Sequence, residues 1–160
     1  MNQQDLFISM TLQAWHLQVK RATAIFDSFT DEGLNAEIAP GKNRVIYLLG
    51  HLTAVNDMML PLLGLAETHY PQLEEPFIKQ PDKTISDIPS AKDLRKYWMD
   101  SNVLIDKTFA SLSAEEWFKK HTAVSEEDFA KEPHRNRLNV LLNRTNHLAY
   151  HIGQLVLIKS

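Results

Sequence analysis

Three of the seven histidines are placed where their imidazoles could share one ligand. His147 and His151 are four residues apart in a segment with helical periodicity, so they stack on one face of the expected helix. His51 lies on the apolar face of another such segment, with Val55 about 40° from it on a helical wheel. Buried imidazoles need partners for both ring nitrogens, and residues 137–160 contain no Asp or Glu. A divalent metal ion bound by all three would satisfy these nitrogens.

A structural role is the alternative for each histidine, because a single histidine on an apolar face is more often a hydrogen-bonded core residue than a ligand. For His51, His147 and His151 the residues alone do not decide between metal ligation and a structural role. The other four histidines are expected at the surface, either off the main stripe of the first helix or in loops: His16, His69, His121 and His134.

The spacing excludes several known metal sites. No Glu accompanies His147 as in the zinc-protease helix, and no Glu-x-x-His motif of the ferritin-like di-iron proteins is present. Neither histidine-bearing segment offers an inward carboxylate for an iron facial triad. A three-histidine site with open positions for water or substrate remains.

Three polar side chains lie one helical turn from these histidines and are candidate catalytic residues: Arg144, Gln154 and Tyr47. Arg144 suits an anionic substrate group, with an arginine that snorkels to the surface or pairs with an acid as the alternative. Gln154 could orient a ligand or bound water, or form an ordinary interhelical hydrogen bond. Tyr47 is a candidate proton donor.

Four segments with helical periodicity must position these groups, and none of the chain is convincing as a strand. They span about residues 4–29, 44–60, 90–109 and 138–158. A capping box at Ser113–Glu116 predicts a short extra helix, and four prolines between residues 70 and 89 predict an irregular crossover. We therefore expect an all-α four-helix bundle, one domain over residues 1–160, whose long crossover leaves room for the third helix to run parallel to the second.

The first helix has two apolar faces. We expect the core to be formed by the first of them: Leu6, Phe7, Met10, Ala14, Leu17, Ala24 and Ile25. The opposite face is expected to be the outer one and to form a homodimer interface: Ile8, Leu12, Trp15, Val19 and Phe26. The alternative is that the crossover or the short helix at Trp117 covers this second face within the chain.

Composition limits the partners. The chain has 160 residues, a net charge of −3 and no basic stripe, so nucleic acid is not expected. No apolar run approaches the roughly 20 residues that span a bilayer, and no signal-peptide pattern opens the sequence, which predicts a cytoplasmic location without membrane contact. The absence of cysteine excludes disulfides, thiolate metal sites and a cysteine nucleophile.

Two motifs resemble the DinB superfamily, the DinB/YfiT-like metalloenzymes. They are Pro40-Gly41-Lys42 leading into Leu49-Gly50-His51-Leu52, and the run His147–Gln154, which reads HLAYHIGQ. The resemblance covers nearly the whole chain in helix order and length. Family members often carry Arg where this chain has Ile152.

The resemblance implies an up-down-down-up bundle in which His51, His147 and His151 bind a divalent metal ion, foremost zinc or nickel, with manganese or iron as alternatives. It also implies a homodimer. Characterised members include transferases that attach low-molecular-weight thiols to electrophiles, and a thiol-dependent isomerase.

Three functions follow as hypotheses. Neutral imidazoles leave a metal ion its full charge, which acidifies a bound thiol or water. A thiol would have to arrive with a small-molecule substrate, since the chain has no cysteine. The first hypothesis is therefore a thiol-dependent transferase, the second a metal-assisted hydrolase, and the third a non-catalytic dimeric bundle with a structural metal. Structural zinc sites normally have four protein ligands, and only three are apparent here.

Overall fold

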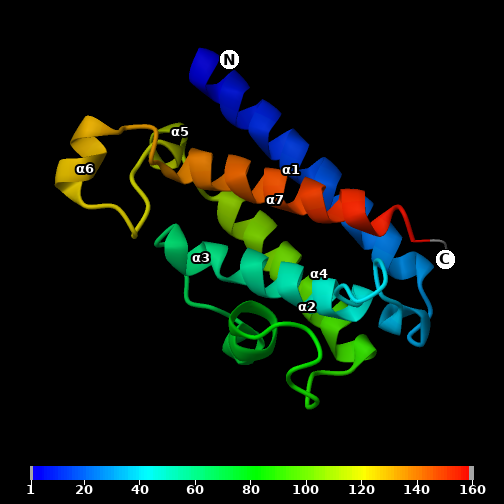
Figure 1. Ribbon diagram of the computed structural model, residues 1–160. Coiled ribbons are helices and arrows are strands. Elements are labelled where there is room, and N and C mark those ends of the chain that lie inside the picture. Colours follow the sequence, from blue (N-terminus) through cyan, green and yellow to red (C-terminus); the bar gives the residue numbers. More distant parts are fainter. Residues whose placement is uncertain (1, 159–160) are drawn as a thin grey trace.

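Helices are the regular elements of residues 2–158, the part of the chain that the computed structural model describes, and no β-strand occurs there (Figure 1). The long helices are α1 (Gln3–Ser28), α2 (Val45–Asp57), α4 (Ala91–Ala110) and α7 (Arg137–Leu155). The short ones are α3 (Met59–Leu62), α5 (Ala114–Trp117) and α6 (Glu126–Lys131). Two 3-10 turns, η1 (Gly33–Asn35) and η2 (Pro71–Leu73), and a π-helical turn, η3 (Glu75–Lys79), complete the elements. The all-α prediction is confirmed.

Contacts between α1 and α4 show that these helices are antiparallel. Arg95, near the start of α4, donates a hydrogen bond to the carbonyl of Phe26 near the end of α1. Earlier in α1, the Nε2 atom of His16 lies 3.1 Å from the carboxylate oxygen Oδ1 of Asp106, near the end of α4. Helix α2 runs parallel to α4, because its first turn shares a pocket with the residues preceding α4, and Asn56 near its end bonds to Asn102.

Helix α7 runs antiparallel to α2. His51 in the middle of α2 meets His147 of α7, whereas Gly64, just after α3, lies beside the guanidinium of Arg137 at the start of α7. The four long helices thus run up, down, down and up, as the colours of Figure 1 show.

Local signals in the sequence explain where the helices begin. Ser90 caps α4 by accepting a hydrogen bond from the Asp93 N–H, and the predicted capping box between Ser113 and Glu116 opens α5. Helix α2 begins without a side-chain cap of its own, directly after Arg44.

The predicted orientation of α1 is wrong. Three residues of the face that we expected to be outer are buried: Ile8, Trp15 and Phe26. The other two, Leu12 and Val19, are half-buried against the core. Side chains of the expected core face are exposed instead: Leu6, Phe7, Met10 and Leu17. One reason is that α4 offers Phe26 a partner: the two rings of Phe26 and Trp98 pack edge-to-face with centroids 5.6 Å apart, and the Trp98 indole N–H donates a hydrogen bond to Thr23.

The short helix at Trp117 covers part of this face within the same chain, as the alternative to a dimer interface expected. Trp117 of α5 is buried and joins the same core as Ile8, so the short helix covers the start of the inner face of α1. A Trp15→Glu substitution would therefore place a charge in the core rather than in a dimer interface.

The connections hold more structure than the sequence predicted. The proline-rich crossover forms η2 and η3, and Leu73 and Phe77 from these turns are fully buried in the core. Helix α6 was not predicted, and it carries no buried residue. Asp82 anchors the end of the crossover, because its carboxylate accepts hydrogen bonds from both the backbone and the guanidinium of Arg44.

One stretch of the described chain, Val45–Leu62, has the length and apolar composition of a membrane-spanning helix. It comprises α2 and α3, and 72% of it is buried inside the protein. The core accounts for its apolar character.

Candidate metal centre

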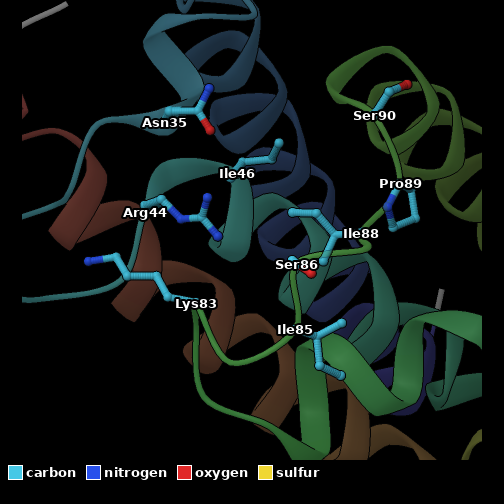
Figure 2. Close-up of a pocket in the computed structure, with 9 residues that line it drawn as sticks. All are labelled: Asn35, Arg44, Ile46, Lys83, Ile85, Ser86, Ile88, Pro89 and Ser90. Carbon is cyan, nitrogen blue, oxygen red and sulfur yellow. The ribbon is translucent and has the colours of Figure 1, made fainter.

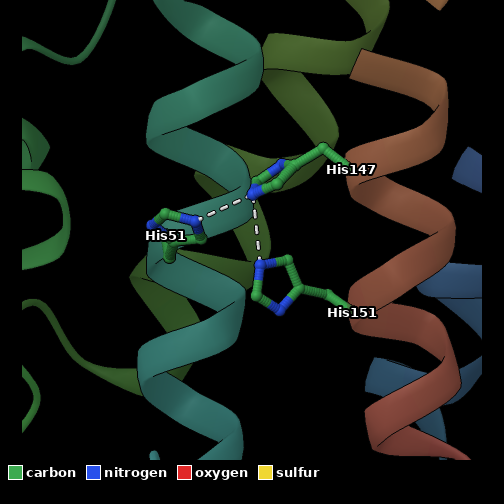
Figure 3. A group of neighbouring side chains, drawn as sticks. All are labelled: His51, His147 and His151. Atoms are coloured by element: carbon green, nitrogen blue, oxygen red, sulfur yellow. Dashed lines mark hydrogen bonds between the residues drawn. The ribbon is translucent and has the colours of Figure 1, made fainter. Parts of the chain in front are cut away.

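The rings of His51, His147 and His151 meet between α2 and α7 (Figure 3). The Nε2 atom of His147 lies 3.3 Å from Nε2 of His51 and 3.1 Å from Nε2 of His151. One ligand nitrogen of each residue lies within 4.8 Å of the others. The three side chains are half-buried.

These distances fit a shared metal ion. Two imidazole nitrogens bound at about 2.1 Å to a tetrahedral ion are about 3.4 Å apart, close to the separations seen between the Nε2 atoms. The donor set is all nitrogen, because no carboxylate among residues 2–158 belongs to the cluster. Such a set suits zinc, nickel and other borderline divalent ions better than magnesium or calcium.

The crossover fixes the ring of His51. Its Nδ1 atom lies 2.8 Å from the carbonyl oxygen of Phe77 in η3. A carbonyl oxygen only accepts hydrogen bonds, so Nδ1 carries the proton and the lone pair of Nε2 points towards the cluster.

Gly50 permits this contact. A Cβ atom at this position would lie 2.4 Å from the Phe77 ring, so only glycine lets η3 pack this closely on α2.

A second hydrogen bond fixes His151 from its own helix. Its Nδ1 atom lies 2.8 Å from Oε1 of Gln154, which accepts the proton of Nδ1–H and leaves Nε2 as the ligand atom. The amide nitrogen of Gln154 in turn donates to the hydroxyl of Tyr150, an exposed residue. Gln154 therefore orients His151, a candidate ligand one helical turn before it, which is one of the two roles that the sequence suggested for Gln154.

All three imidazoles are held towards the neutral form that metal ligation requires. Burial, together with the smaller effects of the neighbouring His151, His51 and Arg144, lowers the pKa of His147 to about 4. Burial also lowers the pKa of His51 and of His151, although the hydrogen bonds to Phe77 and Gln154 act in the opposite direction.

The other two candidate catalytic residues have different surroundings. Arg144 is half-buried, and its positive charge is near enough to lower the pKa of both His51 and His147. The Tyr47 ring stacks on that of His51, but its hydroxyl donates to the carbonyl of Gln80, and burial raises its pKa. Tyr47 thus supports the crossover in this structure.

The other positions that the sequence analysis singled out, the four remaining histidines and Ile152, lie outside the cluster. The other four histidines are exposed or half-buried and lie outside the cluster. Ile152, where family members often carry Arg, is buried in the core. The Phe77 carbonyl and Tyr150 were not predicted, and only the Gly50-His51 pair hinted that another segment approaches α2 closely.

A surface pocket of about 500 Å³ lies elsewhere, between the start of α2 and the end of the crossover (Figure 2). Its two cations are already paired, Arg44 with Asp82 and Lys83 with Glu37. The pocket does not include the three histidines.

Comparisons with known proteins agree with the fold. The sequence pattern of the DinB superfamily matches residues 14–155. The crystal structure of a conserved protein from Enterococcus faecalis is similar with a TM-score of 0.62 and 18% sequence identity, covering 98% of this chain and 94% of that one. This similarity shows the fold alone. No curated protein matches the sequence.

Proposed function

Because this chain belongs to the DinB superfamily, we propose that it is an enzyme that holds one divalent metal ion on His51, His147 and His151 and joins a small-molecule thiol to an electrophile. The observation that carries the proposal is the convergence of three Nε2 atoms. In His51 and His151 a hydrogen bond from Nδ1–H leaves the lone pair of Nε2 free to bind a metal ion. Only three protein ligands are present in the described cluster, which leaves a coordination position for substrate.

Zinc or nickel is the ion proposed, and when bound it supplies the positive charge that favours the thiolate form of a coordinating thiol. The protein's own contribution is to orient the ligands. Phe77 and Gln154 hold the protons of Nδ1 on His51 and His151, and burial keeps the imidazoles neutral.

The surroundings of the cluster favour a thiol over water as the activated group. Zinc proteases pair their metal with a carboxylate base, and the described cluster contains no carboxylate. A coordinating thiol is deprotonated by coordination itself. The chain has no cysteine, so the thiol arrives as substrate, and we place the protein in the cytoplasm, where small thiols are kept reduced.

The metal site is tested by elemental analysis. After dialysis against zinc or nickel, the wild-type protein should retain one ion per chain, and the His51→Ala and His147→Ala variants should lose it. His16→Ala is the matched control, since His16 lies on the surface beside Asp106 and should leave the stoichiometry unchanged. Full retention of metal by both cluster variants would disprove the site.

The reaction is tested with a small thiol and an aromatic chloride whose displacement changes its absorbance. The metal-loaded wild-type protein should accelerate the reaction, and His147→Ala should lose at least about 100-fold of that rate, because removing a ligand costs more than removing its supporting hydrogen bonds. Metal binding without thiol transfer would contradict the transferase assignment, and ester hydrolysis by the same protein would replace it with the hydrolase hypothesis.

A further inference from the structure

Arg144 is a half-buried positive charge without a negative partner in the described part of the chain. Its Nε atom is buried and has no hydrogen-bond partner. By contrast, three other arginines form ion pairs with Asp or Glu: Arg44, Arg95 and Arg135. Burying a guanidinium without a hydrogen-bond partner is unfavourable, so an acceptor that bound to this group would stabilise it.

Neither α7 nor α2 directs a carboxylate at Arg144. The one acidic residue of α2, Asp57, is buried and accepts hydrogen bonds from the backbone N–H groups of His69 and Tyr70. Helix α7 contains no Asp or Glu. Because α2 and α7 are antiparallel with His51 opposite His147, the residues that follow His51 face the part of α7 around Arg144. On that face lie Val55 of α2 and Met58, the residue that follows this helix, and both are apolar.

Arg144 is also close to the metal centre. It precedes His147 by three residues, about 5 Å along the helix axis, and its charge acts on both His51 and His147. A molecule held at the cluster by one end therefore needs only a few atoms to reach the guanidinium with the other.

Resting on the proposed function, we propose that Arg144 binds a carboxylate of the substrate, and that the preferred thiol is a small molecule carrying both groups. The planar guanidinium matches a carboxylate with two parallel hydrogen bonds. The pairing would satisfy the buried nitrogen and orient the sulfur towards the three imidazoles. Arg144 is thus a specificity-determining binding residue.

The first experiment tests the anion site without metal. In the chelator-treated protein, sodium acetate should shift the Arg144 Nε–Hε resonance in ¹⁵N-edited NMR spectra in a saturable way. The resonance is identified by its loss in Arg144→Lys. The absence of a saturable shift would overturn the inference, and a response to inorganic phosphate alone would overturn the carboxylate assignment.

The second experiment tests substrate choice with the cobalt(II)-loaded protein, in which thiol coordination is followed by its absorption band. Wild-type protein should bind 3-mercaptopropionate about tenfold more tightly than 3-mercaptopropan-1-ol, the size of one hydrogen-bonded charge pair. Arg144→Gln should abolish this preference. Arg135→Gln, which removes the same charge from the surface, should keep it.

The outcomes separate the two proposals. Equal affinity of the wild-type protein for the two thiols would overturn the role of Arg144 while leaving thiol binding intact. If neither thiol gives the band, the proposed function fails, and the acetate titration still decides whether Arg144 binds carboxylates. If Arg144→Gln does not fold, Arg144→Lys replaces it, because lysine keeps the charge and loses the paired hydrogen-bond geometry.

Discussion

The chemistry of single residues in this centre depends on which nitrogen of each imidazole carries the proton. His51 and His151 both donate from Nδ1, to a backbone carbonyl and to an amide oxygen, and so both present Nε2. His147 meets both through its own Nε2. Three lone pairs in one small volume repel one another unless a cation or a proton lies between them, so an ion of suitable size relieves this repulsion.

Acid should therefore act against both the fold and the metal. In the unfolded chain an imidazole has a pKa of about 6.5, whereas burial and the neighbouring His151, His51 and Arg144 lower that of folded His147 to about 4. Between these values the unfolded state binds a proton that the folded state excludes, so the free energy of unfolding falls as the pH falls. Above about pH 7 both states are neutral at this group, and its contribution is constant.

We expect the urea midpoint of the chelator-treated protein to fall from pH 7.5 to 5.5, and to fall less in His147→Gln, which lacks this imidazole. The metal-loaded protein should release its ion below about pH 6, because protons compete for the ligands. Equal pH dependence of the two proteins would show that His147 is not held neutral, and metal retained down to about pH 4 would contradict an all-imidazole site.

The grouping of the histidines could be predicted from the sequence, because the four-residue spacing fixes His147 and His151 on one helical face and His51 lies on an apolar one. The hydrogen bond that orients His51 could not be predicted. It comes from the backbone of Phe77, and a backbone carbonyl has no signature in the residue types of a proline-rich crossover.

Among the secondary-structure elements, the contact between η3 and α2 is the one on which the centre depends. Gly50→Ala would place a methyl group 2.4 Å from the ring of Phe77, a fully buried side chain, so that α2 and η3 must move apart. Overpacking of this kind costs about 1–3 kcal/mol in the free energy of unfolding. Displacement of η3 would also withdraw the carbonyl that holds His51, so we expect metal affinity to fall about tenfold or more.

Gly153→Ala is the matched control, measured by the same metal titration and thermal unfolding. Gly153 lies in α7 beside the histidine motif, and a Cβ atom there meets nothing within 4 Å. Alanine should therefore stabilise the helix by about 1 kcal/mol and leave metal affinity unchanged. Equal metal affinity in Gly50→Ala and wild-type protein would show that the Phe77 contact does not orient His51.

The buried face of α1 could not be predicted from the sequence of this helix alone. Both of its faces are apolar, and only the partners contributed by α4, α5 and α7 decide which one is buried. One local signal favoured the observed choice: Arg21 lies at about 40° from Leu17 on the wheel, inside the stripe that we expected to be core. A charged side chain there argues for solvent.

At the scale of the whole molecule, the outer face of α1 is left apolar within a chain of net charge −3. The exposed side chains are Leu6, Phe7, Met10 and Leu17, with Met10 58% exposed. They lie within about 100° of one another on the helical wheel and form one stripe. A two-fold interface brings such a stripe against its own copy, so the predicted homodimer is now expected through this face rather than through Trp15.

We expect wild-type protein to sediment as a dimer at micromolar concentration and Met10→Glu to sediment as a monomer, because the new carboxylate would be buried against apolar side chains of the second copy. Met99→Glu is the matched control: Met99 is 62% exposed and lies on α4, a different helix from the one that carries the stripe, and this variant should remain dimeric. Trp15→Glu should instead lower the melting temperature sharply, since Trp15 is fully buried within one chain. A monomeric wild-type protein would contradict the dimer itself. A dimer disrupted by Met99→Glu but not by Met10→Glu would move the interface to α4.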